Sequence, residues 1–519
     1  MSCHQDTCNK LSALFLFLLM STIAVSCGQE PEKVTDGFVT PLRSVVDLNT
    51  GDSVAVKLSD GTLASLRLLS TDFGTDPFRN AVRSATATVS INGRRVVLES
   101  ANYSLPVSVG GVRLDCPVTS AMYHNTNDDR WGLEADARIR LWPADGPLTR
   151  PGSFGYPVEQ RLLANDTQMS NEPCYANGCE IPTDEDIYYH SGLDFGGTEG
   201  MVSVLAATDG LIVSVGDSVL DAHKTDTPVA PRYDVVYVFD SRGWYFRYSH
   251  LNAIDQALVP GDSIRLGQSV GLLGKEGGSG GWSHLHFEAR ARQPSGKWGT
   301  EESYAYVTEA YRNKYDPALV AVARPHLVAS PGKNVRLDGS RSWSGQGELK
   351  YEWLFTDGTT TEGETITRQY GNPGTYYEGL KVTDSSGRVD YDFCVVQILD
   401  RGRPELVVPM LHVNFHPSLS IQPGDVITFK ARSFNALPGE ESWDFGDGAV
   451  GAVTHSVPCW GSESIVPEGA KNDMLTSEGY DSVTHSYDQP GHYLVTVTRN
   501  TEQGLPVIAR VHVAVGEGN

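Results

Sequence analysis

At 519 residues, the chain is longer than one hydrophobic core usually serves, so we expect several domains. Its composition is 40% hydrophobic and 20% charged, with 53 glycines and 28 prolines, which indicates a folded protein rich in strands and turns and excludes a largely disordered one. The formal net charge of −23, without a visible cluster of Lys and Arg, excludes roles that need long-range attraction to nucleic acid or to an anionic membrane surface.

The first 27 residues have the pattern of an export signal. A polar start is followed by an apolar run from Leu11 to Val25, which is too short for a comfortable membrane span. The run ends in Ala24-Val25-Ser26-Cys27, which resembles the lipobox of bacterial lipoproteins, although Ala24 stands where that pattern more often has Leu. The resemblance implies a lipid anchor on Cys27, and ordinary secretion is the alternative. We therefore expect the protein to be exported to a bacterial cell envelope and anchored there to a membrane, at the outer membrane or in the periplasm. Secretion is the alternative.

Residues 28–37 are polar, without apolar periodicity, and predict a tether. From 38 to 150, short alternating stretches such as Ala85 to Ile91 are separated by turn dipeptides such as Asn92-Gly93. This pattern predicts an all-β N-terminal domain. It contains no catalytic or binding motif, so we interpret it as a scaffold or spacer. A role in positioning or occluding the catalytic groove of the next domain is the alternative.

Strand-like segments richer in glycine continue from 151 to 320, and three histidine motifs follow one another there. They are His190-Ser191-Gly192-Leu193-Asp194, Tyr248-Ser249-His250 and His284-Leu285-His286. Side chains at i and i+2 of a strand share a face, so His284 and His286 can point into one cavity. His190 and Asp194 can converge on a cation if the chain turns at Gly192. Two histidines and one carboxylate leave a fourth tetrahedral position open, which is typical of a catalytic zinc rather than a structural one.

Each motif alone is weak evidence, because a lone histidine is more often a core or surface residue than a ligand. Together, with the continuation His284-Leu285-His286-Phe287-Glu288 and the closing Tyr315-Asp316-Pro317, the stretch resembles lysostaphin/LytM-type zinc metallopeptidases. This family consists of peptidoglycan endopeptidases with a duplicated hybrid motif fold. The resemblance implies that His190, Asp194 and His286 are zinc ligands and that His250 and His284 are the catalytic pair. It also implies hydrolysis of peptide bonds in peptidoglycan cross-links or stem peptides, in wall remodelling or lysis.

Zinc in such a site lowers the pKa of a bound water to about 7 and polarises the scissile carbonyl. We expect His250 and His284 to orient that water, stabilise the oxyanion and return a proton to the leaving amine, with the division of roles left open. Glu288 shares a strand face with His286, and we expect it to support the ligands rather than act as the base. The glycine-rich run Gly277 to Gly281 predicts a loop whose backbone another chain can approach closely, so that an extended peptide could bind there.

Two later segments, 324–400 and 404–516, are similar to one another. Both have a Trp-x-Phe segment before an Asp-Gly turn, Trp353 to Gly358 and Trp443 to Gly448, and both have a Pro-Gly-x-Tyr strand entry. The pair resembles PKD domains, which are immunoglobulin-like β-sandwiches. We expect a spacer, or a module that contacts glycan or protein. Asp444 and Asp447 could touch calcium, but turn formation explains them more simply.

Five cysteines follow Cys27. We predict a local disulfide between Cys174 and Cys179, buried thiols at Cys394 and Cys459, and leave the partner of Cys116 open. The predicted fold class is all-β and multidomain, with an antiparallel peptidase domain between the N-terminal β domain and two sandwiches. Two other functions stay open: a catalytically silent envelope protein that binds or regulates other wall hydrolases, and a secreted protease acting on proteins. The complete set of ligands favours the active enzyme.

Overall fold

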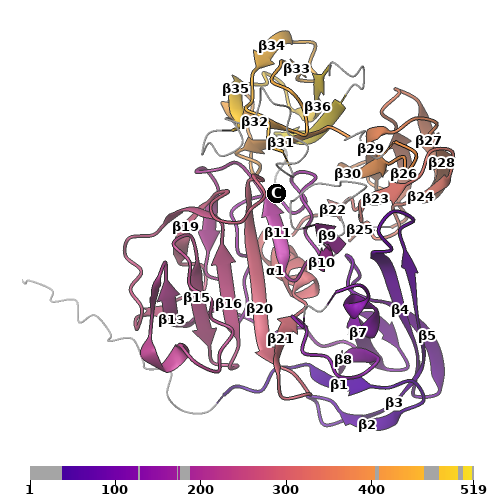
Figure 1. Cartoon of the computed structure of the whole chain (residues 1–519), viewed down its shortest axis with the longest axis vertical. Coiled ribbons are helices and arrows are strands. Elements are labelled where there is room, and N and C mark those ends of the chain that lie inside the picture. The colour runs from indigo at the N-terminus through magenta and orange to yellow at the C-terminus, as the bar shows by residue number, and fades with distance from the viewer. Residues whose placement is uncertain are drawn as a thin grey trace, which may run out of the picture. The chain divides into compact units, whose positions relative to one another are not determined.

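The computed structural model describes residues 38–126, 129–171, 173–175, 187–345, 347–403, 408–460, 479–500 and 507–516. The predicted export signal, lipobox and tether lie outside these residues, as does Cys179 of the predicted disulfide. Strands dominate the described chain, which confirms the all-β class (Figure 1). In the part of the chain described, no helix has the length and apolar character needed to cross a membrane.

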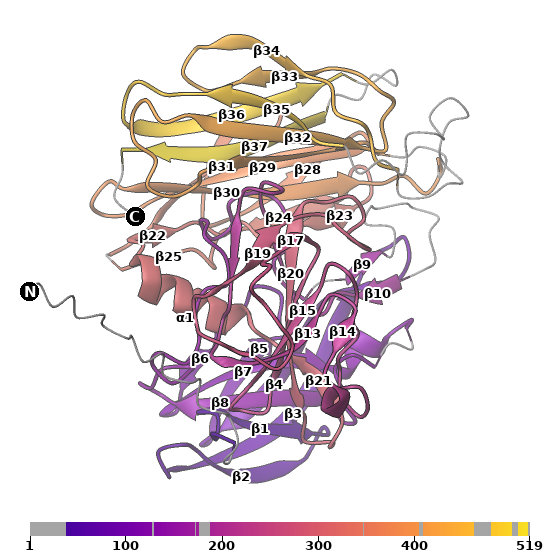
Figure 2. The ribbon, with the colours of Figure 1, turned by 90° about the vertical axis from the view of Figure 1, so that its left-hand side faces the viewer.

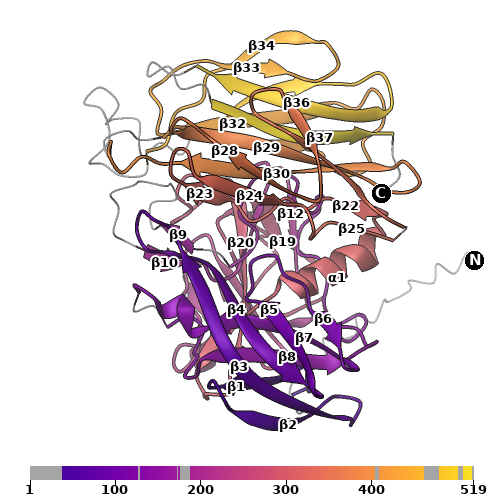
Figure 3. The ribbon, with the colours of Figure 1, turned by 90° about the vertical axis from the view of Figure 1, so that its right-hand side faces the viewer.

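The N-terminal domain consists of two antiparallel four-stranded sheets, whose facing apolar residues form one core that includes Leu66, Ile91, Leu114 and Ile139. Asn92 and Gly93 both have positive φ and connect β4 to β5, as the Asn-Gly signal predicts. Figure 3 shows the long β3–β4 pair. The first sheet contains β1 (Ser44–Leu48), β8 (Ala137–Pro143), β7 (Val112–Thr119) and β6 (Val107–Val109). The second contains β2 (Ser53–Lys57), β3 (Leu63–Thr75), β4 (Val82–Ile91) and β5 (Arg94–Glu99).

Residues 151–320, predicted from the sequence to be a peptidase domain and hereafter the peptidase region, are built on an eight-stranded sheet and a three-stranded sheet. Leu285 and Phe287 of β20 point into their common core, which leaves His284 and His286 on the opposite strand face. The larger sheet contains β11 (Leu193–Gly196), β20 (His284–Arg292), β16 (Tyr245–Ser249), β15 (Val236–Asp240), β13 (Gly210–Val215), β14 (Ser218–Val219), β18 (Ser263–Ile264) and β21 (Trp298–Glu301). The smaller contains β12 (Ser203–Leu205), β19 (Ser269–Leu273) and β17 (Leu251–Ile254); a separate pair is β9 (Pro173–Tyr175) with β10 (Ile187–Tyr189).

A single α-helix, α1 (Tyr304–Tyr315), occurs in the described residues and was not predicted from the sequence. Its tyrosines Tyr304, Tyr306 and Tyr311 are buried in the peptidase core. The helix ends where Asp316 takes a left-handed conformation directly before a proline. It therefore covers the peptidase sheet without changing the all-β class.

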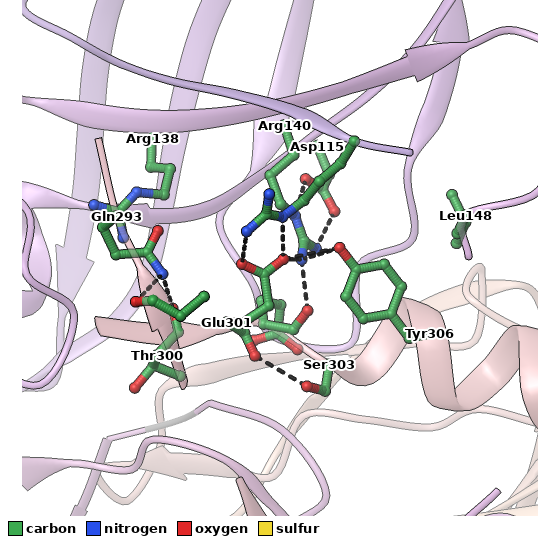
Figure 4. Close-up of polar contacts among 12 residues, drawn as sticks. Asp115, Arg138, Arg140, Leu148, Gln293, Thr300, Glu301, Ser303 and Tyr306 are labelled. Atoms are coloured by element: carbon green, nitrogen blue, oxygen red, sulfur yellow. Dashed lines mark hydrogen bonds and ion pairs between the residues drawn. The ribbon is translucent and has the colours of Figure 1, made fainter. Parts of the chain in front are cut away.

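Buried ion pairs connect the N-terminal domain to the peptidase region (Figure 4). Glu301 of β21 accepts two hydrogen bonds from Arg43, each 2.7 Å, and one of 2.9 Å from Arg140 of β8. The hydroxyl of Tyr306 donates to the same carboxylate at 2.8 Å, and Asp115 pairs with Arg140 at 2.6 Å. The N-terminal domain is thus fixed to the peptidase region by charges that are almost fully removed from water.

Two β-sandwiches follow (Figure 2). Each has a buried tryptophan in its core, Trp353 in the first and Trp443 in the second, as predicted. The first contains β22 (Leu319–Val320), β23 (Leu327–Ala329), β24 (Asn334–Asp338), β25 (Trp343–Ser344), β26 (Lys350–Leu354), β27 (Thr360–Glu362), β28 (Thr365–Gln369), β29 (Gly374–Thr383) and β30 (Val389–Ile398). The second contains β31 (Met410–His416), β32 (Ile427–Phe434), β33 (Glu441–Asp444), β34 (Val450–Thr454), β35 (Asp481–His485), β36 (Gly491–Arg499) and β37 (Val507–Val515).

Asp444 and Asp447 each accept a backbone N–H within their turn, at 2.9 Å, which agrees with a role in turn formation. Cys116 and Cys394 are buried and form no disulfide within the described residues. Cys459 also forms no disulfide within the described residues and is only partly buried. Its thiol contacts the carbonyl oxygen of Gly280 in the peptidase region.

Candidate metal centre and active site

Strand β20 brings the three histidine motifs together because it lies between β11 and β16. In the antiparallel register, Asp194 of β11 and Ser249 of β16 both lie opposite His286. His190 precedes β11 and His250 follows β16, and both rings lie beside His286: His190 Nε2 is 3.1 Å from His286 Nδ1, and the ring centroids of His250 and His286 are 6.1 Å apart. Residues that are far apart in the sequence therefore converge at one point.

Gly192 makes the turn on which the convergence of His190 and Asp194 depends. Its φ is +114°, in the region that favours glycine. A Cβ atom at this position would lie 2.9 Å from the carbonyl oxygen of Phe287 and 3.0 Å from a ring carbon of His286. Only glycine allows the chain to pass this close to the imidazole of His286.

Three groups form a compact set of potential metal ligands. One donor atom each from His190, Asp194 and His286 lie within 4.8 Å of one another. His286 Nδ1 is 2.9 Å from Asp194 Oδ1 and 3.1 Å from His190 Nε2, and His190 Nε2 is 3.2 Å from Asp194 Oδ1. Two imidazole nitrogens and a carboxylate oxygen are the donor set of a catalytic zinc, so these residues fit the metal.

The other two histidines lie directly beside this set. The rings of His250 and His284 have centroids 4.7 Å apart, and His284 Nε2 is 3.6 Å from Asp194 Oδ1. Backbone carbonyls hold both Nδ1 atoms: that of Glu276 is 2.6 Å from His250, and that of Trp282 is 3.0 Å from His284. Because a carbonyl oxygen only accepts hydrogen bonds, these contacts place the ring proton on Nδ1 and leave Nε2 as the unprotonated nitrogen of a neutral imidazole.

Burial keeps the site in the form that binds metal. Burial, assisted by the neighbouring His284 and His286, lowers the pKa of His250 well below its ordinary value. Burial also lowers the pKa of His286 to about 4, against the opposing effect of Asp194. Burial alone would raise the pKa of Asp194, but the facing His190 and His284 hold it well below its ordinary range. At neutral pH the Asp194 carboxylate is therefore charged, and the imidazoles of His250 and His286 are neutral.

Further groups orient the site histidines, and the sequence analysis did not name them. His190 Nδ1 lies 3.0 Å from the backbone oxygen of Ser170, and Asn171 accepts the N–H of Gly192 at 2.8 Å. Asp234, buried and paired with Arg232, accepts the N–H of His250 at 2.9 Å. Backbone oxygens carry no signal in the sequence, and an Asp-Val pair before β15 is too common to be a motif.

Glu288 accepts hydrogen bonds from Ser191 at 3.1 Å, Arg290 at 2.9 Å and Thr300 at 3.3 Å. These contacts fit the expected supporting role, since Ser191 follows His190. The predicted glycine-rich loop does make close approaches, but to other parts of the chain. A Cβ on Gly277 would lie 2.5 Å from the Arg232 guanidinium carbon, and one on Gly281 would lie 2.8 Å from Cys459 Sγ.

Comparison with protein families agrees with this geometry. Residues 188–297, which contain all five site residues, match the model of peptidase family M23. Residues 188–297 form an M23 peptidase domain. Residues 317–397, which follow α1, match the PKD domain model, and this match confirms the first PKD resemblance.

Curated relatives match only short parts of the chain. The mouse dyslexia-associated protein KIAA0319-like protein is 32% identical over 108 residues, which cover 19% of this chain and 10% of that protein. Collagenase ColA of Clostridium perfringens is 27% identical over 101 residues, 19% of this chain and 9% of that protein. The chain therefore spans about a tenth of the length of these relatives.

Solved structures similar to the chain include two bacterial proteins. A structure described as a glycyl-glycine endopeptidase LytM of Ruminococcus gnavus has 20% identity and a TM-score of 0.20, covering 31% of this chain and 61% of that one. Csd3 of Helicobacter pylori has 12% identity and a TM-score of 0.20, covering 51% of this chain and 82% of that one.

Proposed function

We propose that the M23 domain is a zinc metalloendopeptidase that hydrolyses peptide bonds in peptidoglycan cross-links or stem peptides. The observation that carries the proposal is the meeting of a His-Asp-His donor set with a second pair of imidazoles beside it. Zinc, when bound, would act as a Lewis acid and lower the pKa of a water to about 7. Peptidoglycan is the substrate class implied by the resemblance to lysostaphin/LytM-type enzymes.

The residues divide into two roles in this proposal. His190, Asp194 and His286 would hold the zinc. The Nε2 atoms of His250 and His284 could accept a proton from the attacking water, donate a hydrogen bond to the oxyanion after protonation, and return the proton to the leaving amine. Their Nδ1 contacts to backbone oxygens fix the tautomer that this proton transfer requires.

We also propose that the chain acts in a bacterial envelope, exported by its first 27 residues and held by a lipid on Cys27. This proposal rests on the sequence pattern alone. The sandwiches are proposed to contact glycan or protein.

The proposed activity is tested by digesting purified peptidoglycan with the mature chain and identifying the fragments by mass spectrometry. Wild-type protein should release fragments with new amino termini. His284→Ala should lose this activity and keep its zinc, whereas His286→Ala should lose both. Stoichiometric zinc with no cleavage would favour a binding or regulatory protein, and cleavage of protein substrates alone would favour the secreted protease.

A further inference from the structure

The loop directly before β20 is held by the second sandwich. The indole of Trp282 stacks on Phe434 at the end of β32, with ring centroids 4.1 Å apart and planes inclined by 11°. The same indole meets His412 of β31 edge to face at 4.8 Å. Phe434 is 2% exposed and His412 is fully buried, so both rings are covered in this arrangement. Trp282 belongs to the M23 domain but packs on aromatic residues of the sandwich.

The backbone of the same loop is also bound by the second sandwich. Tyr480 accepts the N–H of Ser283 through its hydroxyl oxygen at 3.0 Å. Two other residues of the sandwich donate to neighbouring carbonyls: Arg432 to Gly281 at 2.9 Å and the Cys459 thiol to Gly280 at 3.4 Å. Because these contacts reach main-chain atoms, they fix the path of the loop as well as its side chain.

The contacts of Tyr480 continue into a buried polar group beneath the loop. The Tyr480 oxygen lies 2.7 Å from His412 Nδ1, and the Nε2 atom of that ring lies 2.9 Å from Thr167 Oγ1 and 3.4 Å from Asp166. Thr167 and Asp166 belong to the segment that leads to Ser170, whose backbone oxygen contacts His190. The second sandwich therefore supports two segments of the chain beside the metal centre.

The loop of Trp282 contacts His284, a residue of the proposed catalytic pair. The carbonyl oxygen of Trp282 lies 3.0 Å from His284 Nδ1, so the position of this carbonyl sets the direction and tautomer of the imidazole. The indole and the carbonyl belong to one residue. Movement of the indole off Phe434 would therefore displace the oxygen that orients His284.

We propose that the second sandwich is a positioning element of the active site, in which Phe434, Arg432 and Tyr480 hold the loop of Trp282 and thereby orient His284. The inference rests on the proposed peptidase function and adds a role for a domain expected to be a spacer or contact module. Displacing a catalytic group by about 1 Å can reduce a rate about 100-fold, so a modest loosening of this contact would be measurable.

The test compares Phe434→Ala with Phe445→Ala in the full mature chain. Both residues are buried phenylalanines of the second sandwich, but Phe445 stacks on Trp443 in its core. We expect Phe434→Ala to lower kcat for soluble cross-linked muropeptides about 10- to 100-fold, with KM and zinc content close to wild type. Phe434→Tyr, which keeps the ring, should restore most of kcat, and Phe445→Ala should leave it near wild type. An equal loss of kcat in the two alanine variants would overturn the inference.

Hydrogen exchange of the peptide that spans Ser279 to Leu285 gives a readout independent of activity. The amides of this peptide should exchange faster in Phe434→Ala and in Tyr480→Phe than in wild type, and Phe445→Ala should leave them unchanged. Exchange that is unchanged in both Phe434→Ala and Tyr480→Phe, or faster exchange with an undiminished kcat, would refute the positioning role. If wild-type protein cleaves no peptide substrate, the proposed function fails, and the exchange data still decide whether the sandwich holds the loop. Tyr480→Phe removes one oxygen atom and serves as the activity test if Phe434→Ala does not fold.

Discussion

Replacing Glu301 by Gln should destabilise the junction between the N-terminal domain and the M23 domain. Burial acts to raise the pKa of Glu301, but Arg43, Arg140 and the Tyr306 hydroxyl outweigh it and hold the pKa at about 2, against an ordinary value of 4.5. This difference corresponds to on the order of 3 kcal/mol of stability at neutral pH. A loss of this size also agrees with the cost of leaving buried guanidinium groups without their partner.

The effect should depend on pH in a defined direction. Because the folded-state pKa is lowered, the stabilisation is fully present above pH 4.5 and is lost as the pH falls toward 2. The difference in free energy of unfolding between wild type and Glu301→Gln should therefore be largest at neutral pH and shrink below about pH 4.5.

Urea unfolding followed by hydrogen exchange of peptides from β8 and α1 would measure this difference at the junction itself, since a chain of several domains need not unfold in one step. Glu134→Gln is the matched control, because Glu134 pairs with Lys297 at 3.1 Å on the surface, where its side chain is 59% exposed. We expect a cost below about 1 kcal/mol for the control. A similar cost for both variants, or a Glu301→Gln effect that does not change between pH 7 and pH 3, would refute the reasoning.

Three further changes have defined outcomes. Gly192→Ala should weaken zinc binding about 10- to 100-fold in a competition titration, because the new Cβ meets Phe287 and His286; Gly267→Ala, where φ is also positive but no atom lies within 4 Å, should not. Asp234→Asn should lower kcat by about 10-fold, because Asp234 accepts the backbone N–H of His250. Zinc content should not change, since His250 is not a proposed zinc ligand, and loss of zinc would contradict this. Trp353→Ala should cost the first sandwich about 3–5 kcal/mol, measured by urea unfolding, and a loss below 1 kcal/mol would show that this fully buried ring is not central to its core.

The sequence was informative wherever function depends on side-chain identity and short spacing. The i, i+2 relation of His284 and His286, the turn at Gly192 and the tryptophans of the two sandwiches all follow from local rules, and the structure places each accordingly. The five site residues named from the sequence lie together in the structure.

The remaining features depend on contacts that local rules do not reach. The Ser170 and Trp282 carbonyls orient histidines through atoms that every residue has. The stacking of Trp282 on Phe434 joins residues that are far apart in the chain, so neither shows its partner in the sequence. Helix α1 was missed because its buried tyrosines lie within a region whose other elements are strands.

If the five site residues form an active zinc endopeptidase, peptide cleavage must follow zinc occupancy, and a zinc titration of the metal-free chain measures this dependence. Metal-free protein is supplied with increasing Zn²⁺ while new amino groups released from purified peptidoglycan are counted. We expect no release without metal, a linear rise in release as zinc is added, and a plateau at one zinc per chain. Release that is unaffected by removing the metal, or one bound zinc per chain without any release, would contradict it.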